Sequence, residues 1–243
     1  MRLSGFLARL KKLYGNVPVL EPRDPFALIV WENAAYLVND ERRSLVLETL
    51  NERIGVTPDA LLAAGVRKIE AAIRDGGMQP PHRAAKVFQC AQIVVAYAGG
   101  DLFEALRSLD PKAGRTLLKR FPGIAEPGAT KVMLFCGLAS GPAIESNALR
   151  VLGRLGLIDE GLPYAAGFRA GVAYLLEHGV ATRRRAIEAF SLLRHHGREL
   201  CRRAHPDCGR CPLRTDCRYA RERSSAFAGP GSNKPAAKRS RRT

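Results

Sequence analysis

The sequence has no apolar run of the roughly 18 residues that a membrane-spanning helix requires. Its first 15 residues, MRLSGFLARLKKLYG, are interrupted too often by Arg and Lys to form the apolar core of a signal peptide. They fit a short amphipathic helix better, and we expect a cytoplasmic protein. Six cysteines in a reducing compartment are thiols or metal ligands rather than disulfides.

Alternating apolar and polar residues, the pattern of a half-buried strand, are almost absent. Apolar residues instead recur at helical spacing in segments such as 26–38 and 82–100, with most Gly and Pro between the segments. Thr57-Pro58-Asp59 has the composition of a helix start, with a capping residue followed by Pro in the first turn. The sequence therefore predicts an all-α fold of many short helices.

Acidic residues are too few to balance the basic ones, with 23 Asp and Glu against 39 Lys and Arg and a net charge of +16. Residues 221–243 contribute +6 and the rest of the chain +10, so the excess is not confined to one end. A surface of this charge suits a polyanion such as nucleic acid, although it can also serve solubility alone. We expect 221–243, which is small, polar and basic, to be a disordered tail.

Four cysteines gather in CRRAHPDCGRCPLRTDC with the spacing C-x6-C-x2-C-x5-C. Four soft thiolates so close together can bind one tetrahedral metal ion or one iron–sulfur cubane. Zinc sites more often pair two short Cys-x-x-Cys knuckles, and only one occurs here. We predict a [4Fe–4S] cluster, with zinc as the alternative. The ligands would be Cys201, Cys208, Cys211 and Cys217.

Basic side chains lie within the same segment. Arg202, Arg203 and Arg210 stand between the predicted ligands. A loop fixed by a metal centre can hold such side chains against DNA phosphates, and the alternative is solvated surface charge. Cys90 and Cys136 lie in apolar helical segments, and we expect them to be buried as small hydrophobic residues.

A second motif occupies residues 117–135, LLKRFPGIAEPGATKVMLF, in which a helix meets Pro-Gly-Ile and another helix follows a short turn. Backbone amides in the turn and at the second helix's N-terminus can bind a DNA phosphate without reading sequence. We expect Gly123, Ala125 and Gly128 to form this contact, with Lys131 as a phosphate contact or surface charge.

With both motifs present, the chain resembles the endonuclease III branch of the helix–hairpin–helix (HhH-GPD) DNA glycosylases between about residues 25 and 220. HHGRELC at 195–201 and DPFALIVWENAAYLVNDERR at 24–43 also fit that family. The resemblance implies two helical domains with DNA in the cleft between them. A six-helix barrel would span 25–137, with the hairpin at about 111–135, and an iron–sulfur domain would combine 1–24 with 138–220.

The resemblance also locates the catalytic residues. The family's lyase Lys position falls on Pro127, and its catalytic Asp position, eighteen residues later, falls on Glu145. Pro127 has no primary amine for a Schiff base, which makes lyase activity unlikely unless Lys131, one helical turn later, replaces it. Glu145 keeps a carboxylate that can stabilise a sugar cation or activate water, and the alternative role is a helix N-terminal acid.

Glu32 lies near the position at which related adenine glycosylases use a Glu to protonate the base. A buried Glu with a raised pKa would suit that task. Met78 falls near the family's loop that wedges into the base stack, although a Met filling a surface gap is an equal alternative. The resemblance offers four further residues to line or brace the substrate pocket: Asn33, Tyr36, Asn39 and Asp40.

These observations predict a monomeric, monofunctional DNA glycosylase that flips a damaged or mismatched base out of double-stranded DNA and hydrolyses its N-glycosidic bond. It would be nucleoid-associated in a bacterium and would need no membrane. The main alternative is a noncatalytic protein that binds DNA structure with the same fold, favoured by the altered Pro127 and Glu145 positions and by Ala125. Lyase activity or a zinc-bound regulator are lesser alternatives. The sequence does not identify the base that is excised.

Overall fold

The computed structural model describes residues 2–227, and within these the regular secondary structure is all helical, with one isolated β-bridge between Tyr36 and Gly77. The predicted all-α class is confirmed. The helices are α1 (Leu3–Tyr14), α2 (Pro25–Ala34), α3 (Asp40–Arg53), α4 (Pro58–Ile73), α5 (Pro80–Ala98), α6 (Leu102–Arg107), α7 (Pro111–Leu118), α8 (Glu126–Phe135), α9 (Ser146–Leu155), α10 (Tyr164–Glu177), α11 (Arg183–Glu199), the 3₁₀-helix η1 (Arg214–Asp216) and α12 (Arg218–Phe227).

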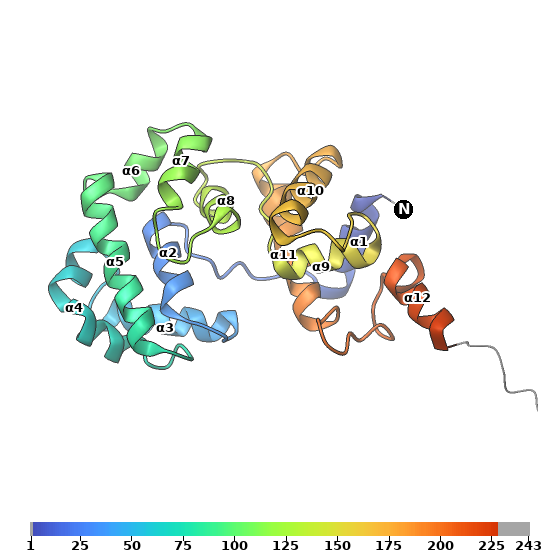
Figure 1. Cartoon of the computed structure of the whole chain (residues 1–243), viewed down its shortest axis with the longest axis horizontal. Helices are drawn as coiled ribbons and strands as arrows, with labels where there is room; N and C mark the ends of the chain where they lie inside the picture. The colour runs from blue at the N-terminus through green and yellow to red at the C-terminus, as the bar shows by residue number, and fades with distance from the viewer. Residues whose placement is uncertain (1, 228–243) are drawn as a thin grey trace, which may run out of the picture.

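Figure 1 shows two lobes, one built from α2–α8 and the other from α1 with α9–α12. The chain passes between them twice, after α1 and after α8. Helix α8 contacts α2 and α7 in its own lobe and α11 in the other, so the second helix of the hairpin motif reaches the boundary between the lobes.

Helix starts follow from local sequence. Side chains of Asp24, Asn39, Thr57 and Asp110 each accept a hydrogen bond from a backbone amide in the first turn of α2, α3, α4 and α7. This satisfies amides that have no partner inside the helix. The predicted start at Thr57 is confirmed, and Gly65, which stands between two of the apolar segments, interrupts α4 with a non-helical conformation.

The core holds the apolar faces of both lobes, with Trp31 and Phe135 among its largest fully buried side chains. Helix α1 buries Leu3, Phe6 and Leu10 and packs against α11, as its amphipathic pattern predicted. Cys90 and Cys136 are buried among apolar residues, as expected. No helix among residues 2–227 is long and apolar enough to cross a membrane.

The predicted disordered tail is wrong at its start, because residues 221–227 continue α12. The guanidinium of Arg154 lies 4.4 Å from the ring centroid of Tyr219, and Arg218 pairs with Glu222 one turn later. The first contact packs α12 against α9, and the second lies within α12, so the helix continues beyond the last cysteine. The remainder of the predicted tail, 228–243, lies outside the described residues.

Candidate active site and metal centre

A pocket of about 380 Å³ opens where the end of α2, the loop between α4 and α5 and the hairpin meet. It brings together residues that are far apart in the sequence. Glu32, Asn33, Tyr36, Met78 and Gly123, all expected to act on DNA or substrate, line it together with Ala35, Gln79, His82, Arg83 and Lys86.

Arg83 fixes one wall of this pocket and was not predicted. It is buried, and its guanidinium donates to the backbone carbonyls of Met78, at 2.8 Å, and Ala34. The amide of Tyr36 also donates to the carbonyl of Gly76, at 2.8 Å. A Cβ on Gly77 would lie 2.2 Å from the Tyr36 carbonyl oxygen, so this close approach requires glycine. The loop carrying Met78 is thus tied to the end of α2.

Glu32 lies at the edge of the pocket with its carboxylate between two cations. Its Oε1 lies 2.8 Å from Lys131 Nζ and its Oε2 lies 3.4 Å from a guanidinium nitrogen of Arg43. Burial opposes the ionisation of Glu32, but the charges of Lys131 and Arg43 outweigh it and hold the pKa of this carboxyl below its usual value. The expectation of a raised pKa is therefore wrong.

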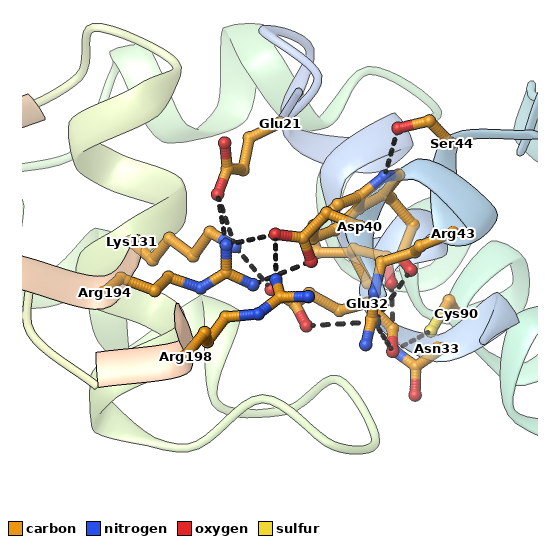
Figure 2. Close-up of polar contacts among 12 residues, drawn as sticks. Glu21, Glu32, Asn33, Asp40, Arg43, Ser44, Cys90, Lys131, Arg194 and Arg198 are labelled. Carbon is orange, nitrogen blue, oxygen red and sulfur yellow. Dashed lines mark hydrogen bonds and ion pairs between the residues drawn. The ribbon is translucent and has the colours of Figure 1, made fainter. Parts of the chain in front are cut away.

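Lys131 is buried, with 7% of its surface exposed, and it forms a second ion pair of 3.3 Å with Glu21. Its Nζ lies 4.6 Å from the ring centroid of Trp31, a cation–π distance. The expectation of a DNA-phosphate contact or surface charge at Lys131 is wrong, because the side chain points from α8 into the core. Figure 2 shows it converging on Glu32 and Glu21.

Asp40 and Asn39 lie away from the Glu32 pocket. The carboxylate of Asp40 accepts hydrogen bonds from Arg194 and Arg198 of α11 (Figure 2). The side chain of Asn39 caps α3. Both line a different pocket, of about 280 Å³, between the start of α3 and α11. Neither residue lines the Glu32 pocket, so the expectation that they line it is wrong, and Asp40 joins the two lobes.

Asn33 lines the Glu32 pocket and also braces the hairpin. Its amide nitrogen donates to the Ile29 carbonyl at 3.0 Å. Gly123 has a φ of +78°, and a Cβ there would lie 2.9 Å from Asn33 Oδ1. The first hairpin glycine therefore satisfies both a left-handed conformation and a close approach to α2.

The rest of the hairpin has features that work against phosphate binding. Ala125 is the N-cap of α8 and provides no side-chain cap, and Pro127 has no backbone N–H. Glu126 in the first turn forms 2.9 Å ion pairs with Arg115 and Lys119. Lys119 and then Arg115 hold the pKa of Glu126 below its usual value, so it carries a negative charge at neutral pH.

Glu145 is the N-cap of α9, which is the alternative role named above. One carboxylate oxygen accepts from the Ala148 amide and the other from the Asn147 side chain, both at 2.8 Å. Each oxygen keeps a second lone pair for a further partner. The charge of Glu145 also contributes, after those of Asp40 and Glu21, to raising the pKa of Arg194 against the effect of burial.

The four predicted cysteine ligands line one pocket at the end of α11, together with Arg154, His196 and Tyr219 among others. No group of three or more His, Cys, Asp or Glu among the described residues is arranged to hold a single metal ion. Four thiols around one pocket are a donor set that fits a [4Fe–4S] cluster, in which each thiolate binds a different iron atom.

Two arginines and a histidine surround the cysteines. Arg154 donates to the carbonyl of Arg202 at 2.8 Å, and Arg150 donates to that of Cys201 at 2.9 Å. His196 lies 3.5 Å from Cys211 Sγ through Nε2 and 2.8 Å from Tyr14 through Nδ1. These contacts fix the backbone of the loop, while the side chains of the predicted phosphate contacts Arg202, Arg203 and Arg210 are exposed.

The two helical lobes, the hairpin between α7 and α8 and the cysteine loop define the helix–hairpin–helix DNA glycosylase fold. An endonuclease III from Sulfolobus acidocaldarius is 26% identical over 201 residues, covering 81% of this chain and 83% of that protein. The resemblance to endonuclease III is thereby confirmed, and the chain is a homologue of that enzyme. No protein-family model matches the chain.

Solved structures agree on the fold. A trapped endonuclease III–DNA covalent intermediate, an estranged-adenine complex, is 19% identical with a TM-score of 0.73 over 91% of this chain and 97% of that chain. A non-covalent endonuclease III–DNA complex is 20% identical with a TM-score of 0.73 over 92% and 97%. A thermostable thymine-DNA glycosylase is 17% identical with a TM-score of 0.71 over 90% and 94%.

Proposed function

We propose that this protein is a DNA repair glycosylase that binds double-stranded DNA, flips out a damaged or mismatched base and hydrolyses its N-glycosidic bond. The observation that carries the proposal is the pocket beside the hairpin, in which Glu32 and Tyr36 from the end of α2 meet Met78 from the loop between α4 and α5. Homology to endonuclease III supports the same reaction class. The net charge of +16 suits a DNA partner.

The enzyme is monofunctional in this proposal and acts as a monomer. A lyase needs an amine that can attack the sugar, and Pro127 has none. Lys131 is buried and paired with two carboxylates, so its amine is not available to attack a sugar. The proposed catalytic residues are Glu145 and Glu32, whose carboxylates would stabilise the sugar cation and position water.

The four cysteines hold a [4Fe–4S] cluster in this proposal. When bound, the cluster supplies a rigid iron–sulfur link among four points of the loop and a centre capable of one-electron chemistry. The loop's exposed arginines, Arg202, Arg203 and Arg210, then contact DNA phosphates, and Met78 enters the base stack. The hairpin adds backbone contacts around Gly123 and Gly128.

Three observations favour a second candidate, a noncatalytic protein that binds DNA structure. The hairpin carries a negative Glu126 and lacks the Pro127 amide, and the Glu32 carboxylate is already paired with Lys131 and Arg43. A pocket retained only for binding would tolerate all of these changes.

A single-turnover excision screen separates the two candidates. Duplexes carrying uracil, thymine glycol, alkyladenine, hypoxanthine, or adenine opposite oxidised guanine are incubated with the protein and then cleaved with alkali. We expect excision of one lesion, its loss in Glu145→Gln with DNA binding retained, and no adduct on borohydride trapping. Tight, salt-dependent binding without excision of any lesion would favour the noncatalytic protein, and a trapped adduct would contradict the monofunctional assignment.

A further inference from the structure

Lys131, Glu32 and Arg43 form a continuous chain of charges from α8 through the end of α2 to α3. We propose that Lys131 is a positioning residue that holds Glu32 as a fixed anion at the pocket edge, so that Glu32 stabilises positive charge on the sugar instead of donating a proton to the base. This inference rests on the proposed glycosylase function and assigns the role of one of its carboxylates.

Hydrogen-bond chemistry makes Glu32 a poor acid. Both of its oxygens face cations, at 2.8 Å and 3.4 Å. An ammonium and a guanidinium are donors that cannot accept a hydrogen bond. Protonation of Glu32 would therefore remove the negative charge that attracts both cations. Neither cation could accept a hydrogen bond from the new O–H group.

Lys131 is held in place by aromatic rings and by carboxylates. Its Nζ lies over the rings of Trp31, Phe135 and Phe190, at 4.6, 5.8 and 5.5 Å from their centroids. A buried ammonium is stable only when paired, and its partners are Glu32 and Glu21. Because α8 is also the second helix of the hairpin, the same helix that faces a DNA phosphate fixes the carboxylate.

The charges around Glu32 come from every side. Cations face it from α8 (Lys131), α3 (Arg43) and α11 (Arg194), and Asp40 and Glu21 share those cations. His82 and Lys86 of α5 also line the pocket. The cations prevail over burial and lower the pKa of Glu32, which agrees with a carboxylate that stays ionised through the neutral range.

The reaction then balances without proton donation by Glu32. The N-glycosidic bond breaks with its electron pair leaving on the base nitrogen, and the sugar becomes a cation. Water adds to the sugar carbon and releases a proton, while the departing base takes a proton from solvent. Glu32 begins and ends as a carboxylate.

The test compares Lys131→Met with Lys131→Arg in the full-length holoprotein, with the exposed Lys68→Met as the matched control. Single-turnover excision is measured from acidic to alkaline pH on the lesion found in the screen. We expect the acid limb of Lys131→Met to move up by about one pH unit or more, since losing an opposite charge shifts a carboxyl pKa by about 1–3 units. The acid limb of the pH profile should be the same in Lys131→Arg and Lys68→Met as in the wild type.

A second readout does not depend on activity. The side-chain carboxyl of Glu32 is titrated by carbon NMR, assigned by its loss in Glu32→Gln, and should titrate below its usual range in wild type and higher in Lys131→Met. If Lys131→Met does not fold, Lys131→Arg and the double variant Glu32→Gln/Lys131→Met replace it. The pH profile of the double variant should have the same acid limb as that of Glu32→Gln alone.

The outcomes separate the two proposals. Absence of excision from every duplex overturns the proposed function together with the catalytic role of Glu32. In an active enzyme, a Glu32 carboxyl that titrates near neutral pH, or a Lys131→Met variant with an unchanged acid limb, overturns this inference and leaves the glycosylase function standing.

Discussion

The carboxylate of Asp40 lies 2.5 Å from a guanidinium nitrogen of Arg198, and this pair joins α3 of one lobe to α11 of the other. Arg194 binds the same carboxylate from the same helix, at 2.8 Å to its second oxygen. The Asp40 contacts therefore help set the distance between the hairpin and the cysteine loop.

Replacing Asp40 with Asn should destabilise the protein strongly, because it leaves two partly buried arginines without their anion. The expected loss is about 3 kcal/mol of unfolding free energy, measured by urea denaturation. The exposed neighbour Glu41→Gln is the matched control and should change stability by less than about 0.5 kcal/mol. Equal stability of the two variants would contradict a structural role for this contact.

The same contact has a predictable pH dependence. Burial opposes the ionisation of Asp40, but Arg194 and Arg198 prevail and lower its pKa below the usual value of about 3.8. A lowered pKa means that the stabilisation is complete above the usual value and is lost as pH falls through the folded-state value. The difference in stability between wild type and Asp40→Asn should therefore stay constant from neutral pH to about pH 5 and shrink below about pH 4.

Purified protein should be brown, with absorbance near ~400 nm and about four iron atoms per chain, as thiolate-ligated cubanes require. Cys208→Ser should lose the colour and most of the iron. Cys136→Ser is the matched control, since Cys136 is buried at the end of α8 and does not line the cluster pocket. Colourless protein with one zinc ion per chain would refute the cluster.

Gly123→Ala should damage the hairpin. The left-handed backbone costs an L-residue about 1–2 kcal/mol, and the new Cβ would lie 2.9 Å from Asn33 Oδ1. We expect a matching loss of stability and weaker binding to duplex DNA in a fluorescence anisotropy titration. Gly141→Ala is the control, because a Cβ there meets open space. Indistinguishable affinities would show that the hairpin does not contact DNA.

Glu126→Gln should strengthen DNA binding. The carboxylate stands in the first turn of α8, where a phosphate would approach, and it holds Arg115 and Lys119 at 2.9 Å. Removing the charge reduces repulsion and releases two cations, for an expected two- to five-fold gain in affinity at low salt (about 0.4–1 kcal/mol). Glu104→Gln, which breaks an exposed pair with Arg107, should leave affinity unchanged. Weaker binding by Glu126→Gln would place the phosphate elsewhere.

The motif HHGRELC shows which features local sequence can predict and which it cannot. It predicted the approach to the cysteines correctly, but the contacts of its residues were invisible. His196 touches Cys211 and Arg198 binds Asp40, partners that are 15 and 158 positions away in the chain. No periodicity or spacing marks such partners.

The sequence by itself determined the helical class, the cap at Thr57, the shared location of four cysteines and the absence of an amine at Pro127, because each follows from side-chain chemistry or from neighbours within a few positions. The tertiary structure alone decided the charge states and partners. Lys131 looked like a surface cation and Glu32 like a candidate acid, yet folding brings them within 2.8 Å, 99 positions apart. Electrostatic energy depends on distance and burial, and only the packing of α8 against α2 sets both.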